Sequence, residues 1–153
     1  DIVEEKNLTR QYFFRDQVGE LKVDALKKNI DRAIRGVRVD AVNRRLVPGK
    51  MAEPFKKVDV VVEAMDNAEA KAQFIEEILL ELPGKPIVAA SGVTGWGMCE
   101  DIEIRRIPPL YIVEDKRAKP SDTGVLLAPK VGVGAHMQAN MVMEIILGVE
   151  NAR

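Results

Sequence analysis

Apolar residues recur every three or four positions in three stretches of the chain, which is the spacing of a helix that buries one face. The first stretch is closed by Gly36 and the second by Pro83-Gly84, residues typical of helix ends. The third stretch is apolar nearly all round, so we expect it to be buried on several sides. The predicted helices cover residues 21–34, 68–82 and 135–147.

Short runs rich in valine and isoleucine lie between these helices. Residues 58–64 (VDVVVEA) and 87–90 (IVAA) are too short for buried helices, so they predict buried strands of the kind found in parallel sheets. Apolar and charged residues alternate over 37–41, which predicts a further short strand. The last two strands would pair with each other across a diproline turn, and they cover residues 102–106 and 111–113.

The order of these elements predicts an α/β fold, with a Rossmann-like, mainly parallel sheet flanked by helices and a small antiparallel β-pair. The sequence shows no internal repeat and no linker, so residues 1–153 are predicted to form a single domain. The charged stretch 114–123 is expected to be a crossover loop. Parallel sheets bind ligands at the carboxyl ends of their strands, which points to Asp66-Asn67 and to Ser91-Gly92.

Composition excludes several classes of protein. Hydrophobic residues make up 46% and charged residues 31% of the chain, which excludes global disorder. The 23 Lys and Arg residues are balanced by 24 Asp and Glu, so we expect no nucleic-acid partner. Cys99 is the single cysteine, which rules out an intramolecular disulfide and a four-cysteine zinc site. With no long apolar run and no leader, we expect a cytoplasmic protein without a membrane partner.

Two groups of polar residues carry the candidate chemistry. Arg10 and Lys22 are the residue types that bind polyphosphates, since arginine offers a planar fork and lysine a compact charge. Asn7 would add a neutral hydrogen bond. The alternative is that these cations are ordinary solvated surface charges. Asp66, at the end of a predicted strand, suits Mg²⁺, which prefers oxygen ligands and phosphates; the alternative is that Asp66 or Asn67 caps the next helix.

Glycine-rich segments do not predict a phosphate loop. Residues 91–97 (SGVTGWG) match neither GxGxxG nor a P-loop, and residues 132–134 lack a third glycine. We interpret 91–97 as a transition from strand to loop. Nothing in the spacing of Cys99 and His136 places them together, so we expect no nucleophilic pair.

Taken together, these motifs resemble those of a known superfamily. Residues 1–11 (DIVEEKNLTRQ) and 18–22 (VGELK) look like the nucleotide-binding stretch of the ThiF/MoeB/ubiquitin-activating superfamily, D-x-V-x-x-S-N-L-x-R-Q followed by G-x-x-K. Residues 60–67 (VVVEAMDN) resemble its strand ending in D-N. Residues 128–133 and 137–139 resemble its closing segment. The chain is most similar to the short, zinc-free ThiF-like proteins linked to thiamine biosynthesis.

The resemblance implies ATP-dependent adenylation of the C-terminal glycine of a ubiquitin-like sulfur carrier, ThiS-like, with release of pyrophosphate. It implies that Asn7 and Arg10 hold the phosphates, that Lys22 stabilises charge at the α-phosphate and that Asp66 holds Mg²⁺. Gln11 and Asn67 complete the implied nucleotide-binding set. The carrier's tail would pass under the loop at 114–123. The resemblance also implies a homodimer. The paired cysteines of the zinc-bearing members of this superfamily are missing here, so we expect no zinc.

The chain departs from the family pattern at several points. The family's first strand and its glycine-rich loop would lie upstream of residue 1, and Lys6 stands where the family has a serine. We therefore expect residues 1–153 alone to bind ATP weakly and to turn over slowly. A sheet without that strand would expose edges and apolar surface, so we expect a dimer or association with the missing segment.

Two other functions are compatible with the sequence. One is a catalytically inactive module of the same family that only docks a carrier or a partner subunit. The other is a nicotinamide-dependent oxidoreductase on a Rossmann-like sheet, which the absence of GxGxxG and the presence of Arg10 and Lys22 disfavour. Fold alone does not decide among the three.

Overall fold

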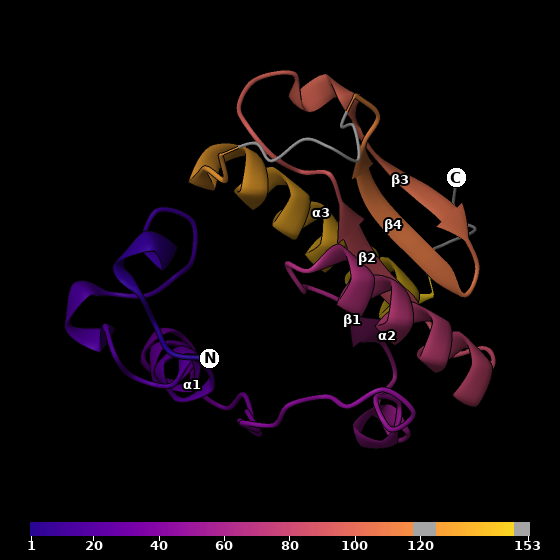
Figure 1. Cartoon of the computed structure of the whole chain (residues 1–153), viewed down its shortest axis with the longest axis horizontal. Helices are drawn as coiled ribbons and strands as arrows, with labels where there is room; N and C mark the ends of the chain where they lie inside the picture. The colour runs from indigo at the N-terminus through magenta and orange to yellow at the C-terminus, as the bar shows by residue number, and fades with distance from the viewer. Residues whose placement is uncertain (118–124, 149–153) are drawn as a thin grey trace. The chain divides into compact units, whose positions relative to one another are not determined.

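The computed structural model describes residues 1–117 and 125–148. The chain forms two compact units, Asp1–Arg45 and Leu46–Arg153. Figure 1 shows the helices and strands of each unit.

The first unit is built around a pairing between its first residues and the start of its helix. Ile2 forms an antiparallel bridge with Leu21. Next to it, the amide of Val3 donates to the carbonyl of Glu20 at 2.8 Å, and the carbonyl of Val3 accepts from the amide of Gly19 at 2.9 Å. The 3₁₀ helices η1 (Glu5–Asn7) and η2 (Arg15–Gln17) and the helix α1 (Lys22–Ala33) complete the unit. Helix α1 confirms the helix predicted over 21–34.

The strand predicted over 37–41 does not form. The segment has no assigned secondary structure, and no strand of the described residues pairs with it. Alternation alone cannot supply the hydrogen bonds that an extended backbone needs from a neighbour. The apolar positions also gain little burial, since Val37 remains 49% exposed. The two charged positions pair with each other in solvent, Arg38 Nη2 lying 3.1 Å from Asp40 Oδ2.

The second unit contains a four-stranded sheet in the order β1-β2-β4-β3. Strands β1, β2 and β4 run parallel, and β3 is antiparallel to β4. The predicted mainly parallel sheet with one antiparallel pair is therefore confirmed. The strands are β1 (Val61–Val62), β2 (Ile87–Ser91), β3 (Ile102–Ile107) and β4 (Leu110–Asp115).

Two helices, α2 (Ala68–Glu81) and α3 (Ala128–Leu147), cover opposite faces of this sheet (Figure 1). Neighbouring residues of a strand point to opposite faces, and the core divides accordingly. Ile87 packs with Phe74 and Ile78 of α2, whereas Val88 packs with Met141 of α3. The sheet is thus the middle layer of the second unit.

Two predicted elements differ from the observed ones. Only Val61–Val62 of the run 58–64 is in a strand, and this strand is a sheet edge on which Val62 is 49% exposed. The third helix begins at Ala128 rather than near residue 135. It is not buried on several sides, because its buried residues form a single stripe, namely Lys130, Gly134, Gln138 and Met141. Its large exposed apolar residues are Met143, Ile146 and Leu147.

The glycines near the start of α3 belong to the helix, and Gly134 serves packing. Gly132 and Gly134 lie inside the helix, which confirms that 132–134 is not a phosphate loop. A Cβ atom on Gly134 would come within 3.1 Å of Cγ1 of Val93, so glycine lets α3 approach the loop after β2. Of the predicted crossover loop 114–123, the first two residues end β4, and residues 118–123 lie outside the described part of the chain.

Candidate functional site

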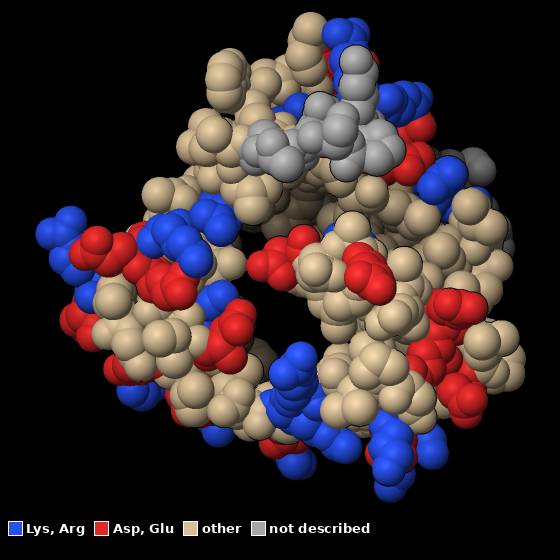
Figure 2. Space-filling model, viewed as in Figure 1, with Lys and Arg blue, Asp and Glu red and all other residues tan. Residues whose placement is uncertain are grey.

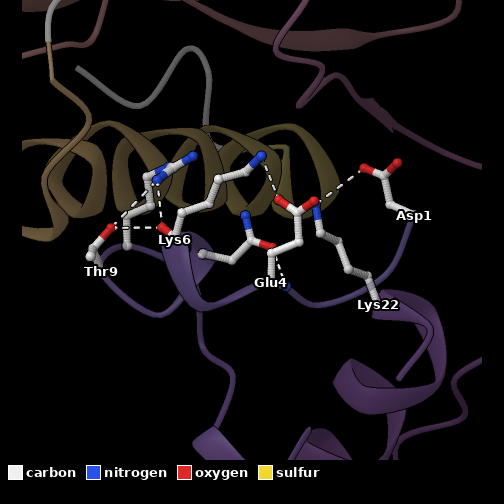
Figure 3. Close-up of polar contacts among 7 residues, drawn as sticks. Asp1, Glu4, Lys6, Thr9 and Lys22 are labelled. Atoms are coloured by element: carbon white, nitrogen blue, oxygen red, sulfur yellow. Dashed lines mark hydrogen bonds and ion pairs between the residues drawn. The ribbon is translucent and has the colours of Figure 1, made fainter. Parts of the chain in front are cut away.

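Lys22 is brought to the amino end of the first unit by the pairing of the chain's first residues with the start of α1. Its amide donates to the carbonyl of Asp1 at 3.0 Å, and its Nζ lies 3.1 Å from Oδ2 of the same residue. The side chain of Lys22 is 27% exposed, so part of the ammonium remains accessible. Figure 3 shows this lysine beside Asp1 and Glu4.

Glu4 joins the cations of this region. Lys6 Nζ lies 2.5 Å from Oε2 of Glu4. The hydrogen bond from Lys6 holds the pKa of Glu4 below its usual value, and the charge of Lys22 lowers that pKa further. Glu4 is therefore ionised at neutral pH and lies between two cations, Lys6 and Lys22, as Figure 3 shows.

Asn7 shapes the turn that carries Arg10 and Gln11. Asn7 is 3% exposed, its Oδ1 accepts a hydrogen bond from the amide of Glu4 at 2.9 Å, and its carbonyl accepts from the amides of Arg10 at 3.1 Å and Gln11 at 2.9 Å. Arg10 Nη1 donates to the carbonyl of Lys6 at 2.9 Å. A guanidinium has five N–H donors, so this contact fixes the side chain and leaves donors for a ligand.

The first unit thus places Asn7 and Arg10 in one turn, and it bonds Lys22 to Asp1 at the start of the segment that leads into that turn. Gln11 borders an open cleft of about 390 Å³ in the same unit. The other residues around this cleft are Tyr12, Phe13, Phe14, Asn29, Arg32 and Ala33.

Asp66 and Asn67 belong to the second unit and take different roles. Asn67 is the N-cap of α2, its Oδ1 accepting from the amide of Ala70 at 2.8 Å. Asp66 is exposed, and among the described residues its carboxylate has no hydrogen bond or ion pair with another side chain. Of the two alternatives left open by the sequence, capping is therefore performed by Asn67, and the carboxylate of Asp66 remains available to a cation.

A magnesium ion at Asp66 would need ligands from elsewhere. The described residues contain no group of three or more His, Cys, Asp or Glu side chains that could hold a metal. Mg²⁺ is commonly bound by one or two carboxylates, several waters and the phosphates of a substrate. A single exposed carboxylate at a strand end fits this mode of binding.

Sequence reasoning missed a buried polar network around Glu63, which precedes Asp66 in the chain. Glu63 is 1% exposed and its Oε1 accepts from the amide of Met65 at 2.5 Å. Its Oε2 lies 3.2 Å from Nζ of Lys71, and Gln138 donates to the carbonyl of Glu63 at 3.0 Å. The signal was present in the sequence, because an acidic residue inside the run 58–64 is unusual for a buried strand.

A second buried ion pair was also missed. Lys130 Nζ, in the first turn of α3, lies 2.5 Å from Oδ2 of Asp115 at the end of β4, and the two side chains are 7% and 5% exposed. The hydrogen bond from Lys130 holds the pKa of Asp115 below its usual value, and the amide of Arg117 also donates to this carboxylate, at 2.9 Å. The pair joins the end of β4 to the start of α3.

Surface charge agrees with the balanced composition. On the face shown in Figure 2, Lys and Arg are interspersed with Asp and Glu. Among the described helices, none is both long enough and apolar enough to cross a membrane.

The family model of the ThiF family matches residues 1–153. The chain belongs to the ThiF family. Among curated proteins, it is 30% identical over 158 residues to the adenylyltransferase and sulfurtransferase MOCS3 of Dictyostelium discoideum, covering 95% of this chain and 35% of that protein. It is 26% identical over 156 residues to the adenylyltransferase and sulfurtransferase UBA4 of Kluyveromyces lactis, with 97% and 35% covered. The ThiF-family chain therefore spans about a third of the length of these relatives.

Solved structures confirm the fold of this ThiF-family chain. The tRNA N6-threonylcarbamoyladenosine dehydratase TcdA of E. coli superimposes with a TM-score of 0.79 at 17% identity, covering 97% of this chain and 74% of that one. A structure of TcdA in complex with ATP gives the same TM-score at 18% identity. At this identity the similarity establishes the Rossmann-like ThiF fold.

Proposed function

We propose that this ThiF-family chain uses ATP to adenylate the C-terminal carboxylate of a small ubiquitin-like sulfur carrier. The observation that carries the proposal is the arrangement of the first unit, in which the chain's first residues pair with the start of α1 beside Lys22 and then lead directly into the turn that holds Asn7 and Arg10. If Arg10 and Lys22 were only solvated surface charges, they would not need such backbone pairing beside them. Membership of the ThiF family supports the same activity.

In the proposed reaction, a carboxylate oxygen of the carrier's last glycine attacks the α-phosphorus of ATP. A bond forms between these atoms, the bond from the α-phosphorus to the bridging oxygen of the β-phosphate breaks, and pyrophosphate leaves with the electron pair. The products are an acyl-adenylate and pyrophosphate. The protein supplies position and charge, and no covalent nucleophile is needed.

Each proposed residue has a role that its contacts allow. Arg10 binds phosphate oxygens through the guanidinium donors that do not contact Lys6, and Lys22 stabilises negative charge at the α-phosphate. Asn7 and Gln11 border the same turn and supply neutral polar groups. Asn67 uses its side-chain oxygen as a cap and retains its side-chain NH₂ for the nucleotide.

Asp66 would hold the magnesium ion of Mg·ATP. When bound, Mg²⁺ neutralises charge on phosphate oxygens. The chain's own contribution is to place one carboxylate, free of side-chain partners among the described residues, in the turn between β1 and α2.

We further propose that the carrier is ThiS-like, that the reaction belongs to thiamine biosynthesis, and that the active protein is a homodimer. The resemblance of the chain to the short, zinc-free ThiF-like proteins linked to thiamine biosynthesis supports this choice.

Exchange of labelled pyrophosphate into ATP tests the proposal. We expect exchange that requires both Mg²⁺ and a ThiS-like carrier, and that disappears with a carrier lacking its last glycine. The rate should be low, because residues 1–153 contain no glycine-rich phosphate loop. Carrier binding without any binding of Mg·ATP would favour the inactive docking module instead, and binding of a nicotinamide dinucleotide would favour the oxidoreductase.

A further inference from the structure

The hydrogen bonds between β1 and β2 stop before β2 ends. In a parallel pair, every second residue of one strand donates an amide hydrogen bond to the next strand. The observed donors are Val61 of β1 and Glu63 just after it, which contact the carbonyls of Pro86 and Val88, both at 2.9 Å. The next bond in this series would join the amide of residue 65 to the carbonyl of residue 90.

Side chains of Glu63 and Lys71 take the place of that bond. The amide of Met65 donates to Oε1 of Glu63 at 2.5 Å, and the carbonyl of Ala90 accepts from Nζ of Lys71 at 2.5 Å. Both backbone groups that the interrupted ladder leaves without a partner are therefore satisfied, each by one member of the Glu63–Lys71 ion pair.

This arrangement is costly compared with an ordinary ladder. The side chain of Glu63 is fully buried and that of Lys71 is 23% exposed, so a charged pair has lost much of its hydration. Apolar side chains with a backbone bond between Met65 and Ala90 would be a simpler solution. Gln138 of α3 adds to the network by donating to the carbonyls of Glu63 and Val88, at 3.0 and 3.4 Å.

The interruption of the ladder determines where the next residues lie. Because Met65 does not continue the ladder, the chain leaves the sheet at this point and Asp66 is exposed in the turn that follows β1. The next residue, Asn67, then caps α2, the same helix that carries Lys71. The turn of residues 65–67 is thus fixed by Glu63 on one side and by α2 on the other.

We propose that Glu63 and Lys71 are a positioning pair that holds the turn of residues 65–67 out of the sheet, so that the Asp66 carboxylate can take part in binding Mg·ATP. This inference rests on the proposed function, since it assigns the pair to the magnesium side of that site. Neither side chain touches the nucleotide in this account.

The double variant E63L/K71M tests the proposal. It removes both buried charges together, so it should fold with a melting temperature equal to or above that of the original protein. The ladder can then close, and Asp66 should lose its position. The measured quantity is ATP binding by calorimetry at increasing Mg²⁺. We expect the Mg²⁺ concentration for half-maximal enhancement of ATP binding to rise about tenfold or more, with ATP binding in EDTA unchanged. The control is E76Q, on an exposed position of α2, which should behave as the original protein.

Each outcome has a definite meaning. If E63L/K71M is folded and keeps the original Mg²⁺ dependence, the positioning role is wrong and the pair is only structural. If E63L/K71M does not fold, E63L alone replaces it, because leucine removes the acceptor of the Met65 amide while Lys71, which is 23% exposed, can turn to solvent, and the same shift is expected. If the unchanged protein shows no effect of Mg²⁺ on ATP binding, the proposed magnesium site itself fails, which is a different result from failure of the variants.

Discussion

Replacing Asp66 by asparagine is expected to lower the rate of ATP–pyrophosphate exchange by about 10²–10³-fold. Asparagine keeps the size of the side chain and removes the charge that would hold Mg²⁺. Since Asn67 rather than Asp66 caps α2, the substitution should not unfold that helix. The measurement is the initial rate of exchange at saturating carrier, with folding checked by circular dichroism.

The matched control is D59N. Asp59 is also exposed and lies just before β1, at the opposite end of the strand from Asp66. This variant should exchange pyrophosphate at the original rate. Equal losses in D66N and D59N would contradict a specific role for Asp66. An inactive docking module predicts a third result. Neither the original protein nor D66N would then exchange pyrophosphate, and D66N would bind the carrier as tightly as the original protein does.

Replacing Lys130 by methionine is expected to lower the free energy of unfolding by about 3–5 kcal/mol at neutral pH. Methionine retains the apolar contacts of the lysine stem and leaves Asp115 as a buried carboxylate without its ammonium partner. Urea unfolding followed by circular dichroism measures the loss. The control is K116M, because Lys116 and Glu103 form an ion pair whose side chains are 56% and 45% exposed. That variant should lose no more than about 1 kcal/mol.

The effect of the Lys130 substitution should depend on pH in a defined direction. The pKa of Asp115 is lowered in the folded protein by the hydrogen bond from Lys130, so the pair stabilises the protein above the ordinary carboxyl pKa, near 3.8. The stabilisation is lost as the pH falls from there through the lowered pKa. The difference between K130M and the original protein should therefore shrink below about pH 4. A difference that stays constant, or a K130M variant no less stable than K116M, would contradict this account.

The helices can be predicted where periodicity and end signals agree. The sequence places helix α2 correctly because its apolar spacing is bounded by Asn67 and by Pro83-Gly84. The strand predicted at 37–41 is wrong because alternation reports which faces of a strand differ, and not whether a neighbouring strand exists. The prediction that α3 is buried on several sides is wrong for the same reason, since apolar residues all round a helix do not specify which elements will cover them.

The two buried ion pairs could not be predicted from the sequence. Lys130 and Asp115 come from separate elements, and no local pattern relates a cation in one helix turn to an acid at a strand end. Glu63 is visible as an acid within a valine run, but its role depends on Lys71 and on the backbone of Met65. Such roles require the register of β1 on β2, which the sequence alone does not specify.

The proposed function requires that Arg10, Lys22 and Asp66 act on one nucleotide. Nuclear magnetic resonance with Mn²⁺ in place of Mg²⁺ tests this most directly, because Mn²⁺ broadens the amide signals of residues near it. With saturating Mn·ATP, we predict that the signals of residues 10, 22 and 66 broaden together, and that those of 10 and 22 recover when ATP is omitted. Broadening confined to residue 66, with ATP bound and residues 10 and 22 unaffected, would contradict the claim.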